Sequence, residues 1–148
     1  MESTPHHVRC TREREHFGRV HADEAATSDL LVPEADQHRY AHPPRHTIYS
    51  KAYYDHLLAP LRGKKVLEIA CGSGFDACLT ASYGAEMYAY DLSAAAIDVA
   101  RRRADVNGVS DRVHFQVCGD LKDAFRGEQF EVVMGFAVLH HLPLQGLA

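Results

Sequence analysis

The sequence predicts an α/β fold built on a doubly wound parallel sheet, and three observations point to it. Short apolar runs typical of strands alternate with stretches of helical periodicity, which is the pattern of consecutive βαβ units. A glycine-rich turn, residues 71–74, follows directly on the first of these runs. The next two runs lead into Asp91 and Asp120. In a parallel sheet these strand ends meet at one edge.

Four segments predict strands, because each is a short apolar run bounded by turn-forming residues. They are Lys65–Ala70, Glu86–Tyr90, Val113–Val117 and Phe130–Phe136. The fourth run has little polar interruption, which suits a strand covered on both faces.

The segments between the strands predict helices with recognisable ends. A helix is expected over Phe75–Tyr83, because Gly84 stands just past its end. A second is expected over Ala94–Asn107, because Ser93 can cap it and Gly108 can close it. Its three consecutive arginines, residues 101–103, spread around the helix and are expected to be solvated. A helical turn is expected over residues 121–125.

Two further segments precede the first strand. Residues 47–60 predict a helix, because apolar residues recur on one helical face, Thr47 can cap it and Pro60 ends it. Residues 1–46 hold seven of the 11 histidines and few apolar residues. We expect an extended, solvated arm there, with one short helix around Ala22 to Leu31. The histidines lack metal-ligand spacing, so no metal is expected. The arm (1–46) and the α/β domain (47–148) are thus the expected units.

Composition and charge exclude several classes of protein. No apolar run approaches the roughly 20 residues that span a bilayer, and the amino terminus lacks the apolar core of a secretory signal. The net charge of -4 disfavours a nucleic-acid partner. The four cysteines show no CxxC spacing, which favours reduced thiols and a cytoplasmic protein.

The glycine-rich turn is the first candidate site. Glycines let a ligand approach the backbone more closely than side chains would allow, and the next helix offers free N–H groups. The spacing Gly72-x-Gly74-x-x-Ala77 also fits a dinucleotide-binding fingerprint, so the turn alone does not identify its ligand.

Acidic residues follow the next two strands. Asp91 is expected beside the glycine turn, where its carboxylate can accept hydrogen bonds from ribose hydroxyls. Asp120 follows the third strand along the same edge and can meet an adenine amino group. A surface acid at a strand end and an ordinary Gly-Asp turn are the alternative interpretations of these two residues.

Four segments in chain order resemble the class I S-adenosylmethionine-dependent methyltransferases. They read VLEIACGSG, YAYDLS, VCGD and FEVVMGFAVLHHL, and the resemblance covers about Tyr49 to Leu142. It implies a Rossmann-like sheet in the order 3-2-1-4 and S-adenosylmethionine as the cofactor.

The resemblance also implies contacts to each part of this cofactor. Its methionyl part would face an acid and the turn, namely Glu68, Ala70, Cys71, Gly72 and Gly74. Its ribose and adenine would be held at the next two loops, namely by Asp91, Leu92, Asp120 and Leu121. Its sulfonium would lie beside the residues after the fourth strand, namely Gly135, Phe136 and Ala137. Cys71 is expected to act only as a small residue of the turn.

Two features favour this cofactor over a nicotinamide dinucleotide. Glu68 would repel a pyrophosphate, whereas it would attract a sulfonium and an ammonium. The segment AVLHHL after the fourth strand also resembles methyltransferases and not dehydrogenases. Within it, His140 and His141 are candidate bases for an oxygen or nitrogen acceptor, while polar contacts at a helix start are the alternative.

Methyl transfer to a small molecule is therefore the expected function. An NAD-dependent oxidoreductase and a non-catalytic cofactor-binding or interaction protein are the alternatives. The family sheet normally has seven strands, so we expect a sheet truncated after strand four, with the C-terminal half of the domain missing. The exposed edge of strand four predicts self-association or a complementing chain, and this chain alone is expected to lack useful turnover.

Overall fold

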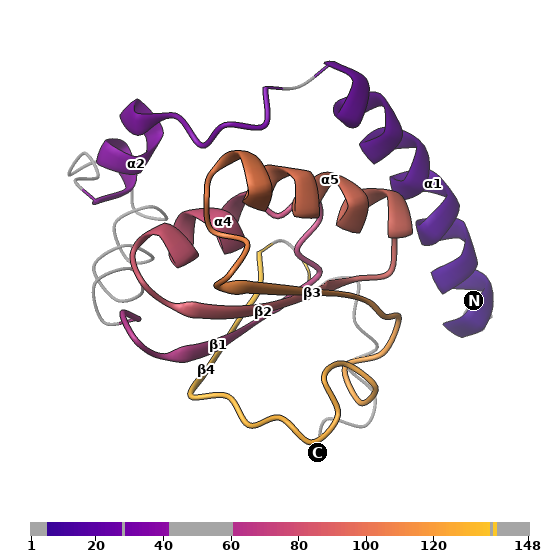
Figure 1. The fold of residues 1–148 in the computed structure, drawn as a ribbon. Coiled ribbons are helices and arrows are strands. Elements are labelled where there is room, and N and C mark those ends of the chain that lie inside the picture. Colours follow the sequence, from indigo (N-terminus) through magenta and orange to yellow (C-terminus); the bar gives the residue numbers. More distant parts are fainter. Residues whose placement is uncertain (1–5, 28, 42–60, 137, 139–148) are drawn as a thin grey trace, which may run out of the picture.

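Four parallel strands form one sheet in the order β3-β2-β1-β4 (Figure 1). The computed structural model describes residues 6–27, 29–41, 61–136 and 138. The strands are β1 (Lys65–Ile69), β2 (Glu86–Asp91), β3 (Val113–Val117) and β4 (Val132–Met134). The predicted α/β class, parallel sheet and strand order are thereby confirmed.

The register brings the carboxyl ends of the first three strands together. Ile69 of β1 pairs with Tyr90 of β2, and Tyr90 pairs with Gln116 of β3. The segments that follow these three residues therefore leave the sheet side by side. This is the edge at which the sequence places the candidate site.

Strand β4 is shorter than the predicted Phe130–Phe136. Phe130 lies outside it, and its ring centroid is 5.3 Å from that of Tyr88 and 6.4 Å from that of Phe125. Phe130 is therefore held in an aromatic cluster on one face of the sheet, where the chain approaches β1 before it joins the ladder.

Helices α4 (Phe75–Ser82) and α5 (Ala94–Val106) cover the other face of the sheet (Figure 1). Both end one residue earlier than predicted. The predicted cap of α5 is confirmed, because Ser93 Oγ accepts a hydrogen bond from the amide of Ala96 at 3.2 Å. Successive residues of β2 lie on opposite faces of the sheet: Met87 packs under the helices, and Tyr88 packs in the aromatic cluster.

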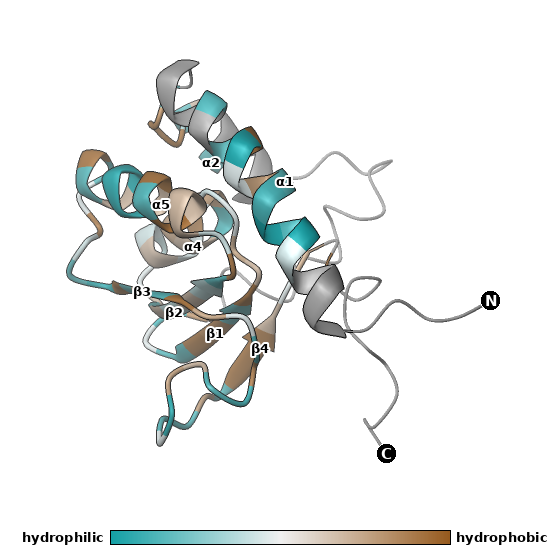
Figure 2. Cartoon of the chain, turned by 90° about the vertical axis from the view of Figure 1, so that its right-hand side faces the viewer, coloured by the Kyte–Doolittle hydropathy of each residue, from teal (hydrophilic) through white to brown (hydrophobic). Residues whose placement is uncertain are grey.

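The expectation of an extended amino-terminal arm is wrong. Residues 6–27 form the 22-residue helix α1 (His6–Thr27), and α2 (Glu34–Ala41) follows. The short helix expected around Ala22 to Leu31 is also wrong, since α1 ends at Thr27. Arginine, glutamate and alanine favour helix, and no proline interrupts this stretch. Figure 2 shows that α1 is largely hydrophilic where its colour is given, so it lacks the apolar stripe that marks a helix in sequence.

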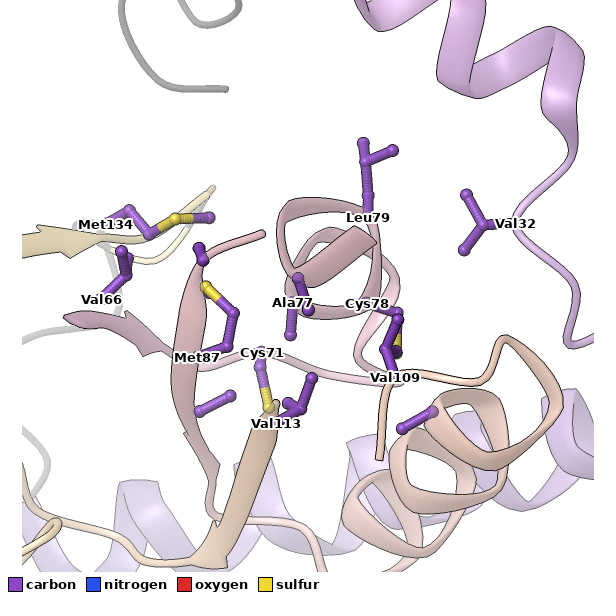
Figure 3. Close-up of a cluster of buried hydrophobic side chains, with 14 of the residues drawn as sticks. Val32, Val66, Cys71, Ala77, Cys78, Leu79, Met87, Val109, Val113 and Met134 are labelled. Atoms are coloured by element: carbon purple, nitrogen blue, oxygen red, sulfur yellow. The ribbon is translucent and has the colours of Figure 1, made fainter. Parts of the chain in front are cut away.

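The connection between α1 and α2 is fastened to the domain. Val32 is 6% exposed and belongs to the core under α4 and α5, and Figure 3 shows it opposite Leu79. Asn107 Oδ1 accepts from the Val32 amide at 2.8 Å. The Tyr83 hydroxyl donates to the Gln37 carbonyl at 2.9 Å.

Several sequence expectations fall outside the described residues, namely the helix over 47–60 and the division at residues 46–47. Within the described ranges, no group of three or more His, Cys, Asp or Glu side chains could hold a metal ion. No helix in that part of the chain is long and apolar enough to cross a membrane.

Candidate cofactor site

The turn between β1 and α4 is fixed by backbone hydrogen bonds. Cys71 donates to the Tyr90 carbonyl of β2 at 3.0 Å, and Gly74 donates to the Cys71 carbonyl at 2.9 Å. The Cys78 amide of α4 donates to the Gly74 carbonyl at 3.0 Å. The turn is thus tied at one end to the neighbouring strand and at the other to the helix that follows.

The two glycines of this turn meet different surroundings. Gly74 has a φ of 74°, and a Cβ there would lie 2.7 Å from the Ala100 Cβ, so it permits close packing against α5. Gly72 has a φ of 53°, and a Cβ there would lie 3.5 Å from the His21 Cε1. Gly72 is therefore the glycine of the pair whose missing side chain leaves space on the α1 side of the turn. Ala70, just before the turn, has a φ of 54° and is exposed.

Asp91 joins the glycine turn to the loop after β2. Its Oδ2 accepts from the Gly72 amide at 3.0 Å, and its Oδ1 accepts from the Ser93 amide at 2.8 Å. The side chain is 8% exposed. Each carboxylate oxygen keeps a second lone pair, so these backbone bonds leave Asp91 able to accept further hydrogen bonds. Leu92, beside it, is partly buried.

Three acidic side chains gather beneath this turn. Glu68 is 3% exposed, and its Oε2 has no hydrogen-bond partner among the described residues. Burial, together with the charges of Asp76 and Asp91, raises the pKa of Glu68 well above its usual value. Burial also raises the pKa of Asp76 to about 6. A cation placed here would favour the ionised forms of Glu68 and Asp76.

Cys71 shares this environment. Burial and the charges of Glu68 and Asp91 raise the pKa of its thiol well above the usual value. Burial raises the pKa of Cys78 to about 12. Both thiols are therefore neutral at physiological pH and poor nucleophiles.

The loop after β3 adjoins the same edge. The Cys118 amide donates to the Asp91 carbonyl at 2.8 Å, which joins this loop to the previous one. Asp120 is exposed, and its Oδ1 accepts from the Lys122 amide at 2.9 Å, so it caps its own turn. Leu121 is 45% exposed.

The segment after β4 reaches the end of β1. A Cβ on Gly135 would lie 3.3 Å from the Ile69 carbonyl oxygen, and Phe136 is 43% exposed. The predicted site residues Ala137, His140 and His141 lie outside the described residues.

Helix α1 brings residues that the sequence interpretation missed. Figure 1 shows α1 on the side of the domain where the first three strands end. A Cβ on Gly18 would lie 4.0 Å from Ser93 Oγ, and Arg14 Nη2 would lie 3.8 Å from a Cβ on Gly119. With His21 over Gly72, positions 14, 18 and 21 form one helical face across three loops. Their spacing of four and three residues is the available sequence signal.

Arg103 is a further correction. Arg101 and Arg102 are exposed as expected, but Arg103 is 4% exposed and donates from Nε to the Ser73 carbonyl at 3.0 Å. Asp76 was also missed, because one acid in the first turn of a helix is common and carries no special signal.

Comparisons with known proteins agree with this geometry. The family model described as a methyltransferase domain matches residues 66–148. The ubiquinone biosynthesis O-methyltransferase of Azorhizobium caulinodans is 37% identical over 90 residues, which cover 61% of this chain and 35% of that protein. That of Thiobacillus denitrificans is 40% identical over 85 residues, which cover 57% of this chain and 36% of that protein. The chain thus spans little more than a third of these curated relatives.

A comparison with solved structures also matches the fold of this chain to that of a methyltransferase. That protein is the S-adenosylmethionine-dependent methyltransferase from Thiobacillus denitrificans in complex with S-adenosyl-L-homocysteine. It is 26% identical with a TM-score of 0.51, and the match covers 72% of this chain and 44% of that chain. The resemblance to class I methyltransferases and the cofactor it implies are confirmed at the level of the family. Because the family model matches more than half of it, this chain belongs to the methyltransferase domain family.

Proposed function

We propose that this chain binds S-adenosylmethionine at the glycine turn and takes part in methyl transfer to a hydroxyl of a small molecule. Membership of the methyltransferase domain family supports the reaction. The names of the relatives, ubiquinone biosynthesis O-methyltransferases, support the class of acceptor. A cytoplasmic location is part of the same proposal.

The observation that carries the proposal is the buried carboxylate of Glu68, with one oxygen lacking a described partner and two further acids nearby. S-adenosylmethionine carries a sulfonium and an ammonium group. Either cation would offset the cost of ionising Glu68 in this buried position. The residues present therefore fit this cofactor.

The same acids disfavour the alternative cofactor. A nicotinamide dinucleotide would place its doubly charged pyrophosphate at the glycine turn. Glu68 and Asp76 in their ionised forms would repel it, whereas Asp91 would suit the ribose of either cofactor. The dehydrogenase alternative is therefore the weaker one.

The chain's residues would divide the work of binding. Glu68 and the turn would hold the methionyl part, Asp91 the ribose, and Asp120 the adenine edge. When bound, the cofactor supplies a methyl group activated by positive sulfur. The protein's part is to fix its orientation and exclude water. His140 and His141 remain the proposed bases toward the acceptor.

Isothermal titration of the 148-residue chain with S-adenosylmethionine and with NAD⁺ tests the cofactor. We expect binding of the first and none of the second. Asp91→Asn should weaken binding by about 1.5–3 kcal/mol, the range for hydrogen bonds to a charged group. Glu68→Gln should weaken the binding of S-adenosylmethionine more than that of S-adenosylhomocysteine, because S-adenosylhomocysteine has lost the sulfonium charge. Tighter binding of NAD⁺ would overturn the proposal.

We further propose that the free edge of β4 joins a second chain, either another copy or a complementing partner. β4 pairs with β1 on one side. No other strand in the described part of the chain pairs with its outer side. Val133 on this strand is 56% exposed.

A further inference from the structure

We propose that Arg103 is a positioning residue for the glycine turn. Through it, docking of the amino-terminal segment is coupled to cofactor binding. This inference rests on the proposed function, since it concerns the turn at which the cofactor is placed. It concerns how this turn is held in place, by Arg103 and Asn107, which are not themselves assigned to the cofactor.

The first step is the contact with the turn. Arg103 Nε donates to the Ser73 carbonyl at 3.0 Å. The Gly74 amide, at the other side of the same peptide group, donates to the Cys71 carbonyl at 2.9 Å. The peptide between Ser73 and Gly74 is thus held from both sides. Arg103 thereby limits rotation of the peptide group at the centre of the turn.

The second step is the contact with the amino-terminal segment. Arg103 Nη1 donates to the Leu30 carbonyl at 3.2 Å, and Asn107 Nδ2 donates to the same oxygen at 2.8 Å. Asn107 Oδ1 also accepts from the Val32 amide at 2.8 Å. One guanidinium therefore spans two pieces of chain that are far apart in sequence.

The third step is the place of α1. Leu30 lies three residues after the end of α1 at Thr27. Fixing Leu30 fixes the carboxyl-terminal end of the helix whose His21 lies over Gly72. Arg103 thus supports the turn from behind and helps to hold α1 in front of it.

The fourth step is the chemistry of arginine. The side chain is 4% exposed, and its guanidinium carbon lies 5.7 Å from the centroid of the Phe75 ring. A planar guanidinium can donate hydrogen bonds to two carbonyls at once, and the Phe75 ring restricts its orientation. A lysine ammonium keeps the charge and lacks this geometry. Because coupling between two binding events is reciprocal, cofactor binding must in turn stabilise docking of the segment.

Wild-type protein gives the first test. S-adenosylhomocysteine should slow amide hydrogen exchange in residues 11–23 of α1 and in residues 29–32, measured on the full 148-residue chain. Unchanged exchange at saturating ligand would overturn the coupling. Failure of the wild type to bind at all would overturn the proposed function instead.

Arg103→Lys gives the second test, with Arg102→Lys on the exposed side of α5 as its matched control. Loss of the guanidinium should weaken S-adenosylhomocysteine binding about tenfold, which is the lower end of the range for losing a hydrogen bond to a charged group. Ligand-induced protection of α1 should disappear. The control should bind within twofold of wild type. Wild-type affinity in a folded Arg103→Lys protein would overturn the inference.

A double-mutant cycle separates coupling from general destabilisation. Asn107→Ala loosens Leu30 and Val32 while it leaves the contact between Arg103 and Ser73 in place. It should weaken cofactor binding about threefold in the wild-type background and have no further effect with Arg103→Lys. Equal effects in both backgrounds would show that the two residues act independently and would overturn the coupling.

Discussion

At the scale of single residues, Gly74 is constrained both by its backbone conformation and by its contact with α5. Its φ is 74°, and an added Cβ would lie 2.7 Å from the Ala100 Cβ. The left-handed conformation costs a residue with a side chain about 1–2 kcal/mol, and overpacking costs about 1–3 kcal/mol more. We therefore expect Gly74→Ala to lower the free energy of unfolding by about 2–5 kcal/mol in urea denaturation.

Gly108→Ala is the matched control for this prediction. Gly108 has a φ of 66°, and nothing lies within 4 Å of a Cβ placed there. Its substitution should cost only the conformational part, about 1–2 kcal/mol. Equal losses at the two positions would show that contact with α5 does not constrain the turn.

Asp76 should make stability depend on pH. Its carboxyl has a usual pKa of 3.8, which burial raises to about 6 in the folded protein. Between these values the folded state binds more protons than the unfolded one, so stability falls as pH rises and levels off above pH 6. The amino end of α4 favours the carboxylate and reduces the effect, so we expect about 1–3 kcal/mol.

Urea titrations of wild type and Asp76→Asn at pH 4 and pH 7 measure this pH-dependent contribution to the free energy of unfolding. The asparagine does not titrate, so the variant does not lose stability in this way, and its stability relative to wild type should rise from pH 4 to pH 7. A constant difference between the two proteins would contradict the raised pKa. Because the charge of Asp76 also raises the pKa of Glu68, the same comparison in a Glu68→Gln background isolates the contribution of Asp76.

Sequence patterns identify the residues whose positions follow from the sheet. Asp91 was predicted at the glycine turn because it ends a strand next to β1, and register alone brings it to Gly72. Arg103 was missed, because consecutive arginines on a helix look solvated and only packing shows which one is buried. The proximity of Asp76 to Glu68 likewise depends on how α4 sits on the sheet.

At the scale of elements, the cap of α5 offers a direct test of a local interaction. Ser93 is 1% exposed, and its hydroxyl satisfies the Ala96 amide. Ser93→Ala should lower the free energy of unfolding by about 1 kcal/mol, the usual value of such a cap. The exposed Ser110 provides the control, since Ser110→Ala should change stability by less than about 0.5 kcal/mol. Similar losses in both variants would argue against the cap.

Strands and α5 were predictable because their signals are local: apolar runs, a capping serine and a closing glycine. Helix α1 was not, because its few apolar residues form no stripe. Its docking depends on the hydrogen bonds that Leu30 and Val32 make with Asn107. Such contacts join residues distant in sequence, and a periodicity search within one segment cannot detect them.

At the scale of the whole molecule, the outer edge of β4 should determine the association state. Val133→Lys places a charge on this strand, a common way to block pairing of edges. We expect wild type to self-associate or to bind a complementing chain, and the variant to shift toward monomer in size-exclusion chromatography with light scattering. Val106→Lys, at a 53% exposed apolar position on α5, is the control. A monomeric wild type that binds no partner, or an equal shift in both variants, would exclude β4 as the interface.

The docking of Val32 has a consequence for the order in which the molecule folds. Its amide bonds Asn107, 75 residues further along the chain, and its side chain enters a core made by α4 and α5. During synthesis α1 leaves the ribosome long before this docking surface exists. Contacts of such sequence separation are slow to form, so the segment should join after the sheet and its helices have assembled.

Val32→Ala should therefore speed unfolding several-fold and leave the refolding rate unchanged, as expected for a contact formed after the transition state. Stopped-flow chevrons in urea measure both rates. Refolding slowed in proportion to the lost stability would instead place the segment in the folding nucleus. If α1 docks last, the glycine turn is formed but uncovered for a time in every newly made chain. In that interval the cofactor could bind before α1 docks.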